Sequence, residues 1–339
     1  MKDFSKQYQT IGIIGWGLLG DVLMRTPVVH AIRQIFPNAK ITVIVDSIGE
    51  EIFRHNLDVD EIFLFDRKNK PKWKYVINKI TGMLKVRNHK FDLLIDLYSS
   101  KSSANLLMLS GASYRIGFTH SHLTDKTYNL PFPDEFKRAS SHHLSRGLLK
   151  VVSIFGYDFE EYDIRPRFLL RNDTQNTMAK YLAEFNLTRT YVLNLGSGGT
   201  EKILPMEKSF QQVKFLYEKY NYTPLIVCNP GQEYLQQQFV NDYMIPSMLP
   251  YGALRKLSLE EIGSVMSLSN FIVTPDTGLY HLAVAIDLPL FGIFTCTSLT
   301  EVKPENGLYI QYLDQSDSSS EHLLQRTEEF VKLLEEKNQ

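Results

Sequence analysis

Short apolar runs recur along the whole chain and are separated by stretches with helical periodicity. The runs are continuous rather than alternating, which is typical of strands buried on both faces of a parallel sheet. Seven runs predict strands in this way: Ile11–Ile14, Ile41–Val45, Leu93–Asp96, Tyr191–Leu195, Leu225–Cys228, Phe271–Thr274 and Leu290–Phe294.

Helical signals fill the segments between these runs. Residues 26–36 place apolar side chains on one helical face, and Thr26-Pro27 predicts the N-cap and the first helical residue. Ser258 followed by Glu261 fits a capping box before another apolar helix. Strands and helices that alternate in this way indicate an α/β fold with parallel sheets.

The middle of the chain interrupts this alternation. Residues 157–175 are polar and contain Pro166, and a strand–loop–helix start recurs near residues 11 and 191. We therefore predict two Rossmann-like domains with parallel sheets facing a central cleft. Their boundaries are 1–165 and 175–320, and residues 321–339 form an amphipathic C-terminal helix.

Composition narrows the function classes. The 339 residues carry a net charge of −1 and are 43% hydrophobic, which suits two packed domains and does not favour nucleic acid as a partner. The two cysteines, Cys228 and Cys296, lie in no zinc-binding spacing, so we expect no metal site and a reducing compartment. The polar N-terminus has no signal-peptide pattern, and no apolar run is long enough to span a membrane.

A glycine loop follows the first strand. Residues Gly15–Asp21 match GxGxxG, and Asp46 follows the second strand, as in a dinucleotide-binding unit. Asp21 argues against that interpretation, because a carboxylate at the helix start would repel a pyrophosphate. Asp21 is either a helix N-cap or a general base that faces a cleft.

Two further loops follow strands in the second half. Gly196–Lys202 combines glycines, hydroxyls and a lysine, and Pro275–Ala283 begins a helix; both suit an anion such as a diphosphate. The alternatives are a flexible surface loop, an ordinary Asp-capped turn and a packed histidine. The candidate anion-binding residues are Ser197, Gly198, Lys202, Asp276, Thr277, Gly278 and His281.

A basic segment lies in the first half. Residues 67–90 contain nine Lys or Arg and no Asp or Glu, with Trp73 and Tyr75 interleaved. Such a run is either a solvated face or a site for a phosphorylated acceptor or anionic lipid headgroups.

Several motifs in order resemble glycosyltransferase family 9, the heptosyltransferases of lipopolysaccharide synthesis. The likeness runs from about residue 10 to residue 305. The motifs are Gly20-Asp21-Val22-Leu23 with Pro27, Phe36–Ile41, Phe91–Leu97, Arg115–Phe118, His142 with Arg146, Gly196-Ser197 with Lys202, and Asp276-Thr277-Gly278 with His281-Leu282-Ala283.

The resemblance implies a GT-B glycosyltransferase that inverts the anomeric centre without a metal or other cofactor. The donor is ADP-heptose or a related nucleotide sugar bound by the C-terminal half, and the acceptor is a lipopolysaccharide precursor of the lipid A–Kdo type. Asp21 would be the general base, and Gln232 or Glu233 would join the donor residues named above. The expected acceptor residues are Gly20, Arg67, Lys70, Lys72 and Arg115. The enzyme would work in the cytoplasm at the inner face of the inner membrane.

Some positions depart from the family pattern. Ile203-Leu204 stands where the family commonly has Arg or His followed by Trp, and Thr295-Cys296 replaces Gly-Pro. These changes concern the donor sugar and nucleotide. Two other functions compete with transfer: a non-catalytic binding protein in lipopolysaccharide assembly, and an NAD-dependent oxidoreductase that uses the first glycine loop.

Overall fold

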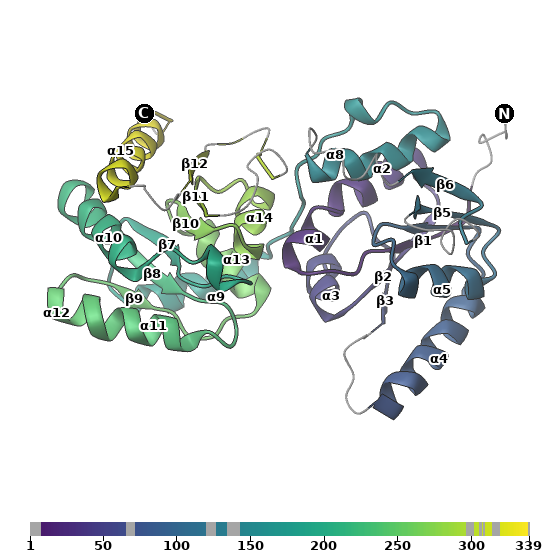
Figure 1. Ribbon diagram of the computed structural model, residues 1–339, viewed down its shortest axis with the longest axis horizontal. Coiled ribbons are helices and arrows are strands. Elements are labelled where there is room, and N and C mark those ends of the chain that lie inside the picture. Colours follow the sequence, from purple (N-terminus) through teal and green to yellow (C-terminus); the bar gives the residue numbers. More distant parts are fainter. Residues whose placement is uncertain are drawn as a thin grey trace. The chain divides into compact units, whose positions relative to one another are not determined.

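The computed structural model describes residues 8–65, 72–119, 127–133, 143–295, 302–304, 307, 309–313 and 319–337. The chain divides into two compact units between Phe168 and Leu169, within the polar segment at residues 157–175. The described residues 302 and 303 belong with the first unit, and the final helix belongs with the second. Figure 1 shows both units.

The first unit is built on a six-stranded, all-parallel sheet with the order β3-β2-β1-β4-β5-β6. Its central strands are almost entirely buried, as the apolar runs predict. The strands are β1 Thr10–Ile14, β2 Lys40–Val45, β3 Glu61–Leu64, β4 Leu93–Asp96, β5 Tyr114–Thr119 and β6 Leu130–Pro133. The helices are α1 Leu19–Leu23, α2 Thr26–Ile35, α3 Ser47–Phe53, α4 Lys72–Asn88, α5 Lys101–Ser110 and α8 Leu144–Leu149. Two 3₁₀ turns follow α8, at Lys150–Phe155 and Phe159–Glu161.

The second unit repeats this architecture. Its parallel sheet has the order β12-β11-β10-β7-β8-β9, which is the first sheet's order when the strands are counted from β7. The strands are β7 Thr190–Asn194, β8 Thr223–Val227, β9 Gly252–Ala253, β10 Ile272–Pro275, β11 Leu290–Phe294 and β12 Tyr309–Leu313. The helices are α9 Asn172–Ala183, α10 Met206–Tyr220, α11 Glu233–Phe239, α12 Ile245–Ser247, α13 Leu259–Ser267, α14 Gly278–Ala285 and α15 Ser320–Lys337. A 3₁₀ turn at Thr200–Lys202 and a π-helical turn at Val240–Met244 complete the unit.

Each unit has its own apolar core. In the first, Trp16, Phe65 and Leu94 belong to one buried cluster. In the second, Phe271 lies among Tyr191, Tyr222 and Phe330, so α15 packs on the core rather than standing apart from it. None of the helices in the described segments combines the length and apolar composition that a bilayer crossing needs.

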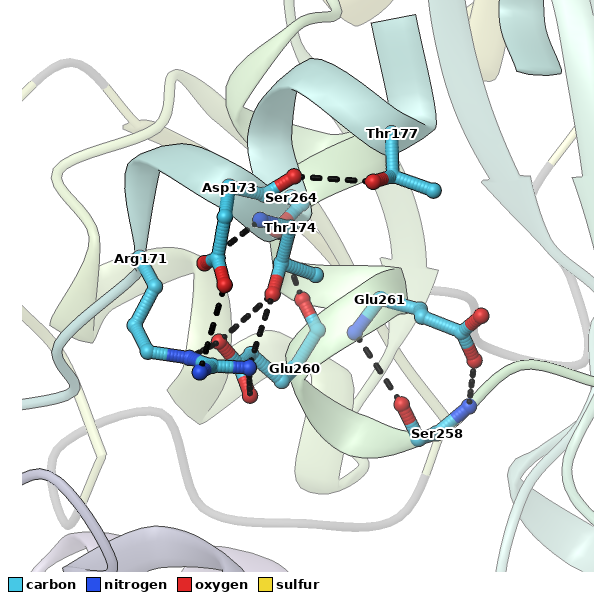
Figure 2. A network of polar contacts seen from close by, with 8 residues as sticks. All are labelled: Arg171, Asp173, Thr174, Thr177, Ser258, Glu260, Glu261 and Ser264. Atoms are coloured by element: carbon cyan, nitrogen blue, oxygen red, sulfur yellow. Dashed lines mark hydrogen bonds and ion pairs between the residues drawn. The ribbon is translucent and has the colours of Figure 1, made fainter. Parts of the chain in front are cut away.

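A polar network joins α9, the first helix of the second unit, to α13 (Figure 2). Arg171 donates from Nε to Glu260 at 2.7 Å, and the Thr174 hydroxyl donates to the same carboxylate at 2.8 Å. Ser258 and Glu261 form the capping box predicted from the sequence, with Ser258 N–H donating to Glu261 Oε2 at 2.8 Å. The network therefore fixes the start of the second unit to a helix about 90 residues further along the chain.

One predicted helix boundary is wrong by a residue. Thr26 is the first residue of α2, and its N-cap is Arg25, which makes no side-chain cap. The Thr26 hydroxyl instead donates to the Leu23 carbonyl at 2.7 Å and accepts from Arg167 N–H at 2.7 Å. The short helix α1 directly precedes α2, so the backbone at this position is already helical.

Candidate active site

Asp21 lies at the third residue of α1, directly after the glycine loop that follows β1. Its side chain is exposed, and Oδ2 accepts a hydrogen bond from Leu18 N–H at 3.1 Å. Leu18, and not Asp21, is the N-cap residue. Over the part of the chain that the structure describes, no group bonds to Oδ1. Asp21 thus closes the helix start with one oxygen and presents the other to solvent.

A buried cation lies beneath this loop. Arg25 is 6% exposed, and its Nε donates to the Leu97 carbonyl at 3.2 Å, while its Nη1 is buried without a hydrogen-bond partner among the described residues. Burial lowers the pKa of the Arg25 guanidinium, and the negative charge of Asp21 is the strongest effect that opposes this shift. Gly17 allows the close approach, since a Cβ there would stand 2.7 Å from Nη1 and 2.8 Å from Asp21 Cβ.

The dinucleotide interpretation of this loop does not fit the structure. Trp16 is 1% exposed and packs on Phe65 with ring centroids 5.3 Å apart, so its side chain serves the core. Asp46 is the N-cap of α3 and accepts from Gly49 N–H at 3.4 Å, so this carboxylate is engaged in capping a helix.

The buried carboxylate of Asp96 organises the neighbouring strand end. Its oxygens accept from Ser99 N–H at 2.8 Å and from the Tyr128 hydroxyl at 2.7 Å. Burial raises the pKa of Asp96, and these hydrogen bonds oppose the shift. Asp96 therefore shapes the turn that carries the Leu97 carbonyl, to which Arg25 is bound.

The five expected acceptor residues do not form one site in the described structure. Arg115 donates from Nε to the Thr127 carbonyl and from Nη1 to the Ala112 carbonyl, both at 2.7 Å, so the geometry gives it a structural role. Gly20 is adjacent to Asp21 in α1, and Lys72 is the first residue of α4. Arg67 and Lys70 lie outside the described residues.

The second unit places its two anion-type loops together. They follow β7 and β10, which are adjacent strands, and the connections from these two strands lead to opposite sides of the sheet. Such a switch point at the carboxyl ends of strands is where open α/β sheets bind ligands. Asn194 links the loops: its amide donates to the hydroxyls of Thr274 at 2.9 Å and Thr277 at 3.2 Å, and its oxygen accepts from Gly196 N–H.

Lys202 and Asp276 form an ion pair across these loops. Lys202 Nζ lies 2.7 Å from Asp276 Oδ2, and the exposed fractions of the two side chains are 30% and 9%. His281 Nε2 lies 4.0 Å from Asp276 Oδ1. The lysine reaches this position from the short turn at Thr200–Lys202, and the histidine from the first turn of α14. A partly exposed cation is thereby held beside the start of an eight-residue helix.

Gln232 and Glu233 have different roles in this unit. The Gln232 side chain accepts from Ser197 N–H at 3.1 Å and donates to the Ser197 carbonyl at 2.8 Å, so both ends of its amide hold the glycine loop. Glu233 is exposed and accepts from Gly231 N–H at 3.1 Å. Hydrogen bonding from backbone N–H groups, that of Gly231 first, lowers the pKa of Glu233. The Gln232 amide is thus engaged by the glycine loop, whereas the exposed Glu233 carboxylate is open to a ligand.

The positions that depart from the family pattern have structural counterparts. The Thr295 hydroxyl donates to the Glu201 carbonyl at 2.6 Å and so ties the end of β11 to the loop that carries Lys202. Leu204 is 4% exposed and joins the unit's core, where it also lines a small cavity with Asn194 and Pro275. Cys296 lies outside the described residues.

The structure thus gathers Ser197, Lys202, Gln232, Asp276 and His281 in the second unit, whereas Asp21 belongs to the first. Gly198 lies in the same loop as Ser197, and Thr277 and Gly278 begin α14. Sequence reasoning missed Arg25 and Asn194. Asn194 is a polar residue in the apolar run before one glycine loop, and Arg25 is a polar residue in the apolar run after the other. A single polar residue in such a run is the sequence signal that could have identified them.

Comparisons with known proteins show which proteins this chain is similar to. The chain is 21% identical to lipopolysaccharide heptosyltransferase 3 of Escherichia coli over 308 residues, which is 86% of this chain and 85% of that one. A glycosyltransferase family 9 structure from Veillonella parvula superposes with a TM-score of 0.83, at 18% identity over 96% of this chain and 97% of that chain. The E. coli heptosyltransferase WaaC, solved with ADP, gives a TM-score of 0.72 at 18% identity, over 95% and 100% of the two chains.

The two parallel sheets and their strand order give the chain the GT-B fold. The family model for glycosyltransferase family 9 (heptosyltransferase) matches residues 83–331, which is more than half of the chain. The chain therefore belongs to glycosyltransferase family 9, as the sequence motifs predicted.

Proposed function

We propose that this enzyme transfers a heptose from ADP-heptose to a lipopolysaccharide inner-core acceptor of the lipid A–Kdo type, with inversion and without a metal ion. The observation that carries the proposal is the Lys202–Asp276 pair, held at the switch point of a unit whose relative WaaC has been solved with ADP and with ADP-2-deoxy-2-fluoro heptose. The names of the related lipopolysaccharide heptosyltransferases support the acceptor class.

The second unit would bind the donor. Lys202 supplies one positive charge, and the backbone N–H groups at the start of α14 add the positive end of a helix dipole. Ser197 and Gly198, in the glycine loop after β7, would add donors at the same edge of the sheet. When the bond to the anomeric carbon breaks, the leaving ADP gains negative charge, and these groups stabilise it. Asp276 positions Lys202 and reaches the sugar hydroxyls together with Thr277.

The first unit would supply the base. In an inverting transfer the acceptor hydroxyl attacks the anomeric carbon from the face opposite the diphosphate, and its proton passes to a carboxylate. Asp21 has the required free oxygen, Oδ1, while Oδ2 keeps the side chain oriented through Leu18 N–H. The C–O bond to the acceptor forms as the C–O bond to ADP breaks, and the proton ends on Asp21 before release to water.

The acceptor would lie near Gly20 and the basic segment that includes Arg67, Lys70 and Lys72, whose cations suit phosphates or carboxylates. Arg115 belongs to this set only through its remaining N–H donors, because Nε and Nη1 already bind the carbonyls of Thr127 and Ala112. A lipid-linked acceptor places the reaction at the inner face of the inner membrane.

The proposal is tested by mass spectrometry of products from a panel of ADP- and UDP-sugars with a deacylated Kdo-containing acceptor. We expect a mass increase of one heptose with ADP-heptose and at least tenfold slower transfer from UDP-sugars. Thr295 and Leu204 shape the donor loop differently from the family pattern, so a faster reaction with another ADP-sugar would reassign the donor and leave the transferase intact. Absence of any transfer, together with tight donor binding, would instead favour a binding protein.

A further inference from the structure

Exposed apolar side chains gather on two neighbouring helices of the first unit. Helices α4 and α5 pack against each other, and Arg87 Nη1 donates to the Leu109 carbonyl at 3.5 Å, so their last turns are adjacent (Figure 1). Four side chains are exposed on them: Ile80 at 53%, Leu84 at 56%, Met108 at 58% and Leu109 at 43%. We call these four residues, together with Lys85 and Arg87, the α4–α5 face. Scattered exposed apolar residues are ordinary, but a neighbouring group marks an interaction site.

The core does not require these apolar side chains. The helices bury other residues, Val86 on α4 and Leu106 and Leu107 on α5. Gly82 faces inward as well, since a Cβ there would stand 2.3 Å from the Phe65 ring. The described turns of both helices thus carry apolar side chains on the outer side as well as the inner side, and no described residue covers the outer ones.

The same face is positively charged. Neither α4 nor α5 contains an Asp or Glu, and Lys85 and Arg87 are exposed. In the described structure no carboxylate lies within ion-pair distance of either cation. Surface lysines of the second unit are different, because Lys214, Lys219 and Lys332 each pair with a glutamate.

We propose that the α4–α5 face docks the enzyme on an anionic phospholipid surface. Its apolar side chains would enter the boundary between headgroups and acyl chains, and the unpaired cations would bind lipid phosphates. The inference rests on the proposed function in that docking brings the enzyme to a lipid-linked acceptor. The docking itself is measurable without any transfer reaction.

Charge argues against a second copy of this chain as the occupant. In a two-fold symmetric contact through this face, Lys85 and Arg87 of one copy would approach the same residues of the other, with no acidic residue on α4 or α5 to offset them. Like charges that meet across an interface disfavour association. An anionic bilayer provides the complementary charge instead.

The test is flotation of the full-length protein with vesicles of phosphatidylglycerol and phosphatidylethanolamine, compared with phosphatidylcholine vesicles. We expect binding to the anionic vesicles that weakens with added salt, and little binding to the neutral ones. Leu84→Glu/Met108→Glu and, separately, Lys85→Glu/Arg87→Glu should each weaken binding to the anionic vesicles by about tenfold or more.

Matched controls separate the face from general charge and hydrophobicity. Tyr234→Glu/Met248→Glu alters two exposed apolar residues of the second unit, and Lys180→Glu/Lys337→Glu reverses two exposed lysines there. Both controls should bind like the unaltered protein, and all four variants should keep its melting temperature within a few degrees. Equal binding by the face variants and the controls would overturn the proposal. Self-association that Leu84→Glu/Met108→Glu abolishes, without vesicle binding by the unaltered protein, would show a copy interface instead.

A transfer assay with a water-soluble acceptor distinguishes failure of this inference from failure of the proposed function. Leu84→Glu/Met108→Glu should keep the turnover of the unaltered protein on that acceptor, because neither residue is among the cations of the basic segment proposed to bind it. Vesicle binding that depends on the face but occurs without any heptosyl transfer would uphold docking and reject the function. Heptosyl transfer by an enzyme that does not bind anionic vesicles would uphold the proposed function and reject docking.

Discussion

Two residues of the first glycine loop, Gly17 and Asp21, pack closely around the buried Arg25. Gly17 adopts φ of +154°, and its missing side chain leaves room for Arg25 Nη1 and for Asp21. The Arg25 cation is buried, and its Nη1 has no hydrogen-bond partner in the described part of the chain, which is a costly arrangement for a charged group. The position of Asp21 is therefore set by packing from below as well as by the helix that carries it.

Gly17→Ala should impair both turnover and stability. The added Cβ would meet Arg25 Nη1 at 2.7 Å and Asp21 Cβ at 2.8 Å, so the carboxylate must move. We expect kcat to fall by at least tenfold and the free energy of unfolding to fall by about 1–3 kcal/mol from backbone strain. Initial-rate kinetics and chemical denaturation measure the two effects. Gly198→Ala is the control for the denaturation measurement alone, because no atom lies within 4 Å of the Cβ it adds.

Lys202→Met should weaken ADP binding while preserving the fold. The substitution removes the cation that pairs with Asp276, and a charge-assisted hydrogen bond is worth about 1.5–3 kcal/mol, or roughly 10–100-fold in Kd. Isothermal titration with ADP measures the change. Lys214→Met, which removes a surface lysine paired with Glu218, should leave the Kd unaltered. Equal Kd values for both variants would remove Lys202 from the donor site.

Sequence alone identified Asp21, Lys202 and Asp276 as the polar residues at the ends of strands, because glycine loops and helix starts are local patterns. It could not choose between Gln232 and Glu233, since the choice depends on Ser197, 35 residues away. Asn194 was missed for the same reason, as its partner Thr274 is 80 residues distant in the chain. Local patterns predict which residues are candidates, and tertiary contacts decide what each one does.

At the scale of elements, the interior strands were predicted well apart from β5, and the edge strands were not predicted. β4 and β11 have the bounds that their apolar runs gave, since both are enclosed in the sheets. The two-residue strand β9 and the proline-containing β6 are sheet edges, and their sequences carry no continuous apolar run. Such strands are defined by the neighbour with which they pair rather than by their own composition.

The network between α9 and α13 makes a prediction at this scale (Figure 2). Glu260→Ala leaves Arg171 and Thr174 without their shared acceptor, although Arg171 is partly exposed and keeps Asp173 nearby. We expect a loss of about 1 kcal/mol and a fall in Tm of about 2–4 °C, measured by differential scanning calorimetry. Glu336→Ala, an exposed change on α15, should move Tm by less than 1 °C. Identical Tm values would mean that the network does not stabilise the unit.

At the scale of the whole molecule, the proposal divides the reaction between two units with the same strand order. The donor groups all belong to the second unit and the base to the first, so each function can be lost separately. The sequence motifs predicted the family and the GT-B fold because they occur in order along most of the chain. The arrangement of polar contacts within each unit required the structure.

Metal removal tests how the leaving group is stabilised. Lys202 and the backbone N–H groups of α14 are proposed to offset the charge of the departing ADP. Turnover should therefore stay within about twofold of its starting value in excess EDTA, since the proposed stabilising groups are all on the protein. A loss of activity in EDTA that Mg²⁺ restores would show that a cation shares this role.

The most direct test of the central claim compares Asp21→Asn with Asp21→Ala in heptosyl transfer from ADP-heptose. Asparagine keeps an oxygen that can accept from Leu18 N–H but cannot take a proton from the acceptor, whereas alanine loses both functions. If Asp21 is the base, both variants should lose about 10²–10⁴-fold in kcat while binding ADP normally. If Asp21 only closes the helix, Asp21→Asn would turn over at nearly the unaltered rate, and that result would contradict the account.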